Sequence, residues 1–228
     1  MCRAHRNALD LLSVQLPLPW LIATWTAAIA LFGLIALHAA WFRLKNPADL
    51  NVFLGACVAV LMLWQIKAGI EPGLSLHLLG ATALTLMLRP LFALLALAIV
   101  VGSAALWSGQ YAAFAANWLL LGALPVTASW LIHCAVGRWL PPHLFIYLFL
   151  NAFAGAAIAM LVVGAGATLV SLGMGLYSVD HLLNDYLPVY LLMAWGEAFL
   201  TGMLVTLMVV WKPDWVATFS DERYLSPK

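Results

Sequence analysis

Charge is scarce in this sequence. Only 8% of its 228 residues are Asp, Glu, Lys or Arg, whereas 65% are hydrophobic, and the mean hydropathy is +1.02. A soluble domain carries about 25% charged residues, so this chain lacks the polar side chains needed to cover a surface in water. The soluble classes are therefore excluded, and the composition predicts an integral membrane protein that crosses the bilayer several times.

Several motifs are also missing. Cys2, Cys57 and Cys134 form no CxxC pair, which argues against a disulfide framework and a structural zinc site. The sequence contains no Walker loop, dinucleotide fingerprint, HExxH or GxSxG motif, and no basic run that would bind nucleic acid. We therefore expect neither an enzyme nor a nucleic-acid partner, and any ATP hydrolysis would need another subunit.

Long hydrophobic runs are what the sequence has instead. Seven runs are separated by short polar breaks: Trp20–Phe42, Leu50–Ile66, Leu74–Leu88, Leu91–Trp107, Phe114–Val136, His143–Leu172 and Leu187–Trp211. The third run would be a helix only about 22 Å long, so its neighbours must shelter it or it is part of a re-entrant element. The predicted fold is all-α, a bundle of about seven transmembrane helices, with residues 1–228 forming one membrane domain.

Lysine and arginine are distributed unequally between the two sides of this predicted bundle. Alternation of the loops places seven of the ten on one side: Arg43, Lys45, Arg89, Arg138, Lys212, Arg223 and Lys228. The other side has Arg3, Arg6 and Lys67. Because positive charge concentrates in cytoplasmic loops, we expect an outer N-terminal segment at 1–19 and a cytoplasmic tail at 212–228. The predicted location is the inner (cytoplasmic) membrane.

Small residues cluster in the sixth run, at Gly155–Ala157, Gly164–Gly166 and Gly173–Gly175. In lipid, small residues let helix backbones approach closely, so we interpret these clusters as packing faces. A role in gating is the alternative.

One carboxyl group lies inside a hydrophobic run. Glu197 is close to the middle of the seventh run, where a charge costs about 2.5–3.5 kcal/mol on insertion scales. Its side chain must therefore face the bundle or a wet cavity, and Thr201, four residues later, shares its helical face. Two interpretations follow: a proton or cation site, or a satisfied hydrogen bond between helices.

A histidine lies near the outer end of the third run. His77 follows the break Glu71-Pro72-Gly73, and Gly80, Ala81 and Thr85 come at helical spacings that make one face small and mildly polar. We therefore expect the imidazole to lie beside a space, with Thr85 on the same face. Neutral imidazole suits nickel, cobalt, copper and zinc, which makes His77 the leading candidate metal ligand. A satisfied histidine at the membrane interface is the alternative.

Three further residues complete the candidate set on the outer side. Asn117, early in the fifth run, is expected at a depth similar to that of His77, where an amide usually bonds a neighbouring helix. His5 and His181 share the outer side with His77 and are weaker candidate metal ligands.

A family resemblance rests on these residues. The segment from Gly73 to Gly80, Gly-Leu-Ser-Leu-His-Leu-Leu-Gly, followed by Arg89-Pro90, resembles the Gly-x-Ser-x-His-Leu-Leu-Gly segment of CbiM/NikM-type permeases. These are the substrate-specific membrane subunits of energy-coupling-factor ABC transporters for cobalt and nickel. The segment Gly109–Pro125, which contains Asn117, is similar to the family's Gly/Ala-rich helix, and Trp-Gly-Glu197 resembles its last-helix glutamate motif. The resemblance extends over about residues 50 to 215.

The resemblance implies a seven-helix importer subunit with an outer N-terminus. Its implied partners are a transmembrane coupling subunit, ATPase subunits and membrane lipid. No covalently bound cofactor is implied, and the divalent cobalt or nickel ion is the cargo. In the family, the metal is held by nitrogens of a Met-His N-terminus and by the imidazole that aligns with His77.

The N-terminal sequence departs from the family pattern. It reads Met1-Cys2-Arg3-Ala4-His5, with no histidine at the second position. Cys2, His5 or His181 could substitute, the substrate could be another small nutrient, or the recorded start could be wrong. A structural or regulatory membrane subunit that does not itself transport is the alternative from a different class.

Overall fold

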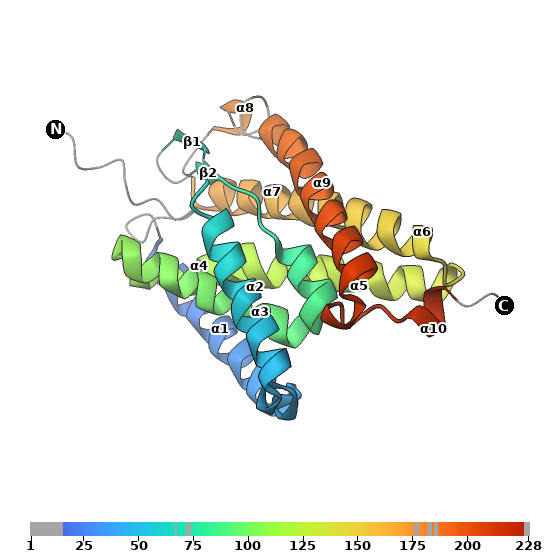
Figure 1. Cartoon of the computed structure of the whole chain (residues 1–228). Coiled ribbons are helices and arrows are strands. Elements are labelled where there is room, and N and C mark those ends of the chain that lie inside the picture. The colour runs from blue at the N-terminus through green and yellow to red at the C-terminus, as the bar shows by residue number, and fades with distance from the viewer. Residues whose placement is uncertain are drawn as a thin grey trace.

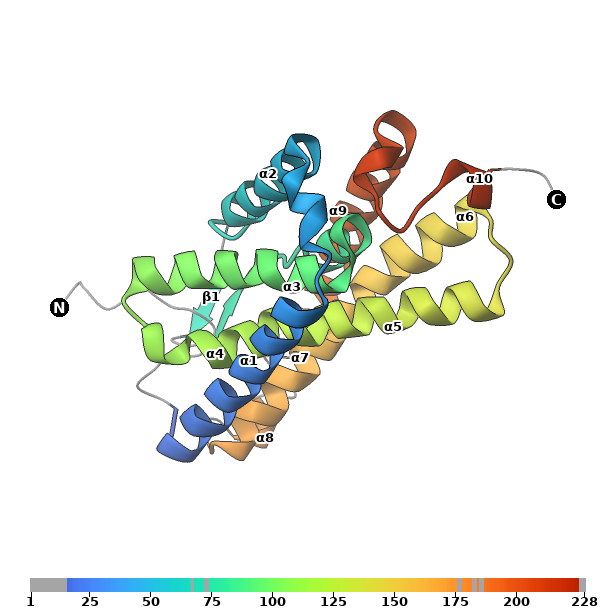
Figure 2. The ribbon, with the colours of Figure 1, turned by 90° about the horizontal axis from the view of Figure 1, so that it is seen from below.

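The computed structural model describes residues 16–66, 68–71, 74–175, 178–181, 184 and 187–225. Helices make up nearly all the regular structure of these residues. The exception is an antiparallel hairpin of two short strands, β1 (Ala68–Glu71) and β2 (Leu74–Leu76). The helices cross one another in a bundle, with the hairpin toward one end and α6 and α10 toward the other (Figure 1 and Figure 2). The prediction of a helical bundle is therefore confirmed, with the hairpin as an addition.

Five helical segments are long and apolar enough to cross a membrane. They are α1 (Leu18–His38); α3 (Ala81–Ser108); η3 (Tyr111–Ala113) with α4 (Phe114–Trp118), the π-helix η4 (Leu119–Ala123) and α5 (Leu124–Trp139); α6 (Leu144–Ile146) with the π-helix η5 (Tyr147–Ala154) and α7 (Gly155–Gly173); and α9 (Leu187–Trp211). A shorter apolar helix, α2 (Pro47–Leu63), lies between the first two. These lengths and compositions make the chain a multi-pass membrane protein.

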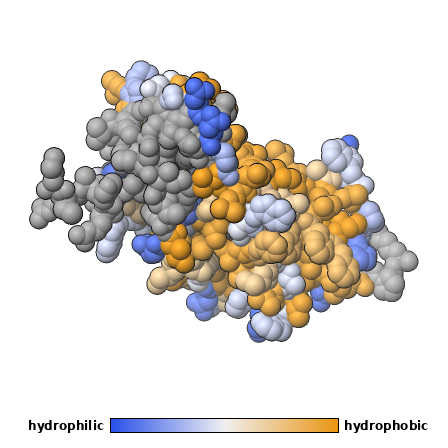
Figure 3. Space-filling model, turned by 90° about the horizontal axis from the view of Figure 1, so that it is seen from above, coloured by the Kyte–Doolittle hydropathy of each residue, from blue (hydrophilic) through white to orange (hydrophobic). Residues whose placement is uncertain are grey.

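Large apolar side chains cover the outside of the bundle. Trp107 is 88% exposed and Leu37 is 81% exposed, and hydrophobic residues occupy much of the face shown in Figure 3. Such a surface would be unstable in water but suits the hydrocarbon core of a bilayer. Among the residues that the structure describes, ten polar side chains lie buried inside the bundle.

The helix predicted over Leu74–Leu88 is wrong in its first half. β2 takes Leu74–Leu76, and the helix begins only at Ala81, after Gly80 has adopted the left-handed conformation with φ 67°. Glycine tolerates this angle, which carries the chain out of the extended segment. The hydropathy of Leu74–Leu88 is the same for either path, so the sequence did not distinguish an extended segment followed by a short helix from one continuous helix.

The helix α3 is divided in two by Arg89 and Pro90. Arg89 has φ 65° and ψ 164°, outside the helical region, so Ala81–Leu88 and the stretch after Pro90 follow different axes. Ala81–Leu88, hereafter the short helix, is about 12 Å long and is too short to cross a bilayer alone. Seven of its eight residues are buried, and Met87 is half-buried. It is therefore sheltered by its neighbours, as its length requires.

The connection between α1 and α2 also differs in detail from the sequence prediction. α1 ends at His38, and the 3₁₀-helix η2 (Trp41–Lys45) follows, so Phe42 is not part of the first long helix. Asn46 then caps α2, because its side-chain oxygen accepts a hydrogen bond from the Ala48 N–H at 3.1 Å.

The C-terminal part of the chain folds back on the bundle. α8 (Val179–His181) precedes α9, and η7 (Pro213–Trp215) and α10 (Asp221–Tyr224) follow it. Val216, Phe219 and Tyr224 pack with Leu86 of the short helix and Tyr147 of η5 in a second hydrophobic cluster. Residues 212–225, hereafter the tail, are thus attached to the bundle by apolar contacts.

The small residues of α7 support the packing interpretation. α9 crosses α7 (Figure 1), and a Cβ atom added at Gly164 would lie 2.5 Å from Cγ of Tyr190 on α9. This distance is far inside van der Waals contact, and Cγ is held close to the α9 backbone. The two helices therefore approach as they do only because Gly164 has no side chain.

We expect Gly164→Ala to destabilise the bundle by about 1–3 kcal/mol, since overpacking forces neighbouring atoms to shift. The measurement is thermal or denaturant unfolding of the purified protein in detergent. Gly33→Ala on α1 is the matched control, because nothing lies within 4 Å of a Cβ atom there. Equal stability of the two variants would contradict the packing interpretation.

Candidate functional site

The candidate site is built on the segment His77–Gly80, which connects β2 to the short helix. None of these four residues is helical, so the helical spacing expected between His77 and Thr85 does not apply. Gly80 ends the segment, and a Cβ atom there would lie 3.2 Å from Cγ2 of Val60 on α2. Both the backbone angle and the space therefore favour glycine at this position.

The carboxylate of Glu197 holds this segment from α9. Its Oε2 accepts the Leu79 N–H at 2.8 Å and its Oε1 accepts the Gly80 N–H at 2.7 Å. Glu197 is 1% exposed, so both bonds lie in the interior of the bundle. The carboxylate also lies at the N-terminus of the short helix, where negative charge is favoured by the helix dipole. Glu197 therefore links α9, by two hydrogen bonds, to the backbone segment that precedes the short helix.

Thr201 lies one turn further along α9. Its side chain is buried and neighbours the Glu197 carboxylate. The hydroxyl oxygen itself has no hydrogen-bond partner with good geometry. Thr201 therefore shares the face of Glu197, as the spacing predicts, and the two backbone N–H groups are the closer partners of the carboxylate.

His77 is buried between this segment and α2. The residue is 5% exposed, and its ring centroid lies 4.3 Å from that of Trp64. The Nδ1 atom is 3.1 Å from the carbonyl oxygen of Leu78, and because a carbonyl only accepts, Nδ1 must carry the proton. This bond fixes the orientation of the imidazole ring. The expected open space beside the ring is partly filled by the Trp64 indole.

Trp64 is a site residue that the sequence analysis missed. The indole N–H donates to the Leu79 carbonyl oxygen at 3.1 Å, and the residue is 2% exposed. Leu79 is thus held on both sides, by Trp64 at its carbonyl and by Glu197 at its N–H. In the sequence, a tryptophan at the end of a hydrophobic run is typical of a membrane-interface residue, so no signal distinguished this one.

The other two buried candidates lie on helices, one on the short helix and one on α4. Thr85 is fully buried on the short helix, and its hydroxyl donates to the Ala81 carbonyl oxygen at 2.7 Å within the same helix. Asn117 is fully buried on α4, which packs against α1 and α3. The structure therefore brings together His77 and Glu197, since the carboxylate bonds Leu79 and Gly80, two and three residues after His77.

The weaker candidate ligands fall outside the structural description. Cys2 and His5 lie before residue 16, and only the backbone of His181 is described, in α8. Among the described side chains, no group of three His, Cys, Asp or Glu residues comes together to hold a metal. The described part of the site therefore supplies one imidazole, on the segment His77–Gly80 that Glu197 and Trp64 hold by hydrogen bonds.

The fold and the loop define a class: a multi-pass helical membrane protein with a histidine-bearing segment buried between its helices. The chain belongs to the CbiM family, the cobalt uptake substrate-specific transmembrane region, whose family model matches residues 14–215. The resemblance seen in the sequence is therefore confirmed. The family is one of transport components.

Two solved structures have a similar fold. The chain resembles a truncated transition metal transporter with a TM-score of 0.67 and 17% sequence identity, over 90% of this chain and 98% of that one. It resembles a second transition metal transporter with a TM-score of 0.66 and 17% identity, over 90% and 92% of the two chains. A search of curated protein sequences gives no significant match.

We expect Glu197→Gln to destabilise the protein by about 1–3 kcal/mol, because one of the two backbone N–H groups would then face an amide NH₂ instead of an oxygen. Unfolding in detergent measures the loss. Asp214→Asn makes the same chemical change at an exposed carboxylate in the tail and is the control. A Glu197→Gln variant as stable as the control would show that the charged carboxylate is not needed.

Proposed function

We propose that the chain is the substrate-binding permease of an energy-coupling-factor ABC importer that takes up cobalt or nickel. The family match over residues 14–215 carries this proposal, because the family is the substrate-specific membrane part of cobalt uptake. The proposed partners are a transmembrane coupling subunit and ATPase subunits. They supply the nucleotide-binding motif for which the sequence has no counterpart.

The role proposed for His77 is that of a metal ligand. Two features support it: the buried imidazole is oriented by the bond of Nδ1 to the Leu78 carbonyl, and the adjoining backbone is hydrogen-bonded to Glu197 and Trp64. A second-shell bond of this kind fixes the orientation of a ligand imidazole. His5 and His181 stay proposed as further ligands, with Cys2 as a possible substitute.

The proposed topology has seven crossings with an outer N-terminus and a cytoplasmic tail in the inner membrane. In it, α2 and the run Leu74–Leu88, which comprises β2, the His77 segment and the short helix, are added to the part of α3 after Pro90 and to the other four long segments. The clustering of basic residues supports this direction. Arg43 and Lys212 line one cavity of about 400 Å³, and Arg43 and Arg89 line another of about 780 Å³. Residues assigned to one side by the charge count thus lie close together.

We expect His77→Ala to reduce cobalt and nickel uptake by about 10-fold or more, since loss of a metal-orienting or metal-binding group costs roughly 10–100-fold in metal affinity. Accumulation of each metal is measured in cells that also express the coupling and ATPase subunits. His38→Ala, which alters an exposed histidine at the end of α1, is the control. Unchanged uptake of both metals by His77→Ala would refute the role of His77.

The topology is tested with two fusions to the C-terminus of the full chain in a bacterial host. We expect a green fluorescent protein fusion to be fluorescent and an alkaline phosphatase fusion to be inactive, because the tail is proposed to be cytoplasmic. Cell fluorescence and phosphatase activity are the two measurements. The opposite pair of results would invert the proposed orientation.

A further inference from the structure

The break at Pro90 leaves two carbonyl groups of the short helix without their usual partners. In a continuous helix, the Leu86 carbonyl oxygen would accept the N–H of residue 90, and that of Met87 would accept the N–H of residue 91. Proline has no N–H. Arg89, with φ 65° and ψ 164°, turns the following chain out of the helical path. Both carbonyls lie inside a membrane protein, where unsatisfied backbone groups are costly.

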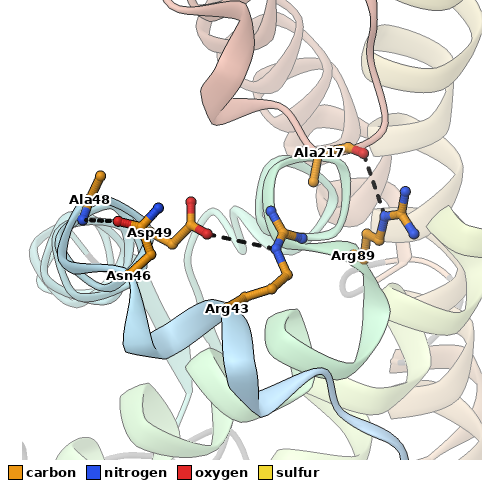
Figure 4. A network of polar contacts seen from close by, with 6 residues as sticks. All are labelled: Arg43, Asn46, Ala48, Asp49, Arg89 and Ala217. Carbon is orange, nitrogen blue, oxygen red and sulfur yellow. Dashed lines mark hydrogen bonds and ion pairs between the residues drawn. The ribbon is translucent and has the colours of Figure 1, made fainter.

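The tail supplies donors to these two carbonyls. The Thr218 N–H donates to the Leu86 oxygen at 3.2 Å, and the Ala217 N–H donates to the Met87 oxygen at 3.0 Å. In return, Nε of Arg89 lies 3.4 Å from the Ala217 carbonyl oxygen (Figure 4). The tail, about 130 residues later in the sequence, thus supplies the N–H donors that the Leu86 and Met87 carbonyls lack within their own helix.

The hydroxyl group of Thr218 connects the short helix to η5. It donates to the Leu86 carbonyl oxygen at 2.8 Å, so its single proton is used there. The Tyr147 hydroxyl, 2.7 Å from the same Oγ1 atom, must therefore be a donor to it. The rings of Phe219 and Tyr224 pack against Tyr147 in tilted orientations, at 5.2 and 4.9 Å between ring centroids, and anchor the tail beside this bond.

We propose that the tail holds the short helix in position through hydrogen bonds to its last turn. Thr218 is then a positioning residue for the segment His77–Gly80. The inference rests on the proposed function, because the property it affects is metal affinity. Glu197 holds the short helix at its first end, at Leu79 and Gly80, and the tail holds it at its last end, at Leu86 and Met87.

The shortness of the helix is the reason that both ends matter. A helix of two turns is not stable on its own, so the position of Ala81–Leu88 is set by its contacts. Leu84 donates its N–H to the Gly80 carbonyl oxygen at 3.0 Å, which joins the loop rigidly to the first turn. Loosening the last turn therefore transmits to Gly80, three residues from His77.

The test compares Thr218→Val with Thr206→Val in the full chain, purified into lipid nanodiscs. The Thr206 hydroxyl donates to the Gly202 carbonyl, a bond within α9 alone, so it is the matched control. Hydrogen exchange of the amides of Leu79–Leu88 is measured without metal. The affinities for Co²⁺ and Ni²⁺ are measured by calorimetry.

We expect Thr218→Val to speed exchange in Leu79–Leu88 and to weaken metal binding, each by about fivefold, the factor that corresponds to one buried hydrogen bond. Thr218→Ser keeps the hydroxyl and should restore both values. Tyr147→Phe keeps the ring contacts with Phe219 and Tyr224 and should produce a smaller change in the same direction. Thr206→Val should match the wild type.

Faster exchange in Thr218→Val with unchanged metal affinity would overturn the positioning role. Wild-type exchange and wild-type affinity in both Thr218→Val and Tyr147→Phe would overturn the proposal that the tail holds the short helix. A wild-type chain that binds neither metal would refute the proposed function and the effect on affinity. The exchange measurement would then still decide whether the tail holds the short helix.

Discussion

The interaction on which the rest of the structure depends is the bond pair between the Glu197 carboxylate and the N–H groups of Leu79 and Gly80. A carboxylate and a non-helical backbone segment are each unfavourable inside a membrane protein. Here they satisfy each other, because the segment offers two adjacent N–H donors and the carboxylate offers two oxygens. This reciprocity allows a loop carrying His77 to enter the bundle.

The same principle governs the other end of the short helix. Pro90 and the left-handed Arg89 interrupt the hydrogen bonds of α3, and the tail completes them through Ala217 and Thr218. Irregular backbone at membrane depth is tolerated only where protein groups bond it. The short helix is therefore a segment whose two ends are bonded by distant parts of the chain, α9 at one end and the tail at the other.

The metal-binding role proposed for His77 follows from this construction. A single imidazole binds a metal tightly only with other ligands around it, and what the bundle supplies is a fixed position for that imidazole. Trp64 covers the ring and bonds Leu79, so the loop is held from α2 as well as from α9. Membership of the CbiM family agrees with a role in which a buried loop binds the substrate of an uptake system.

The sequence by itself determined the membrane class, the long helices, the family, and the need of Glu197 for a partner, because hydropathy and short motifs are local properties. It predicted a helix over Leu74–Leu88, since hydropathy does not distinguish a helix from a buried extended segment. Only the tertiary structure decided that Leu79 and Gly80, 118 and 117 residues away, are the partners of Glu197, that Trp64 packs on His77, and that the tail bonds the broken helix. Each of these is a contact between distant segments, and its geometry depends on how the helices cross.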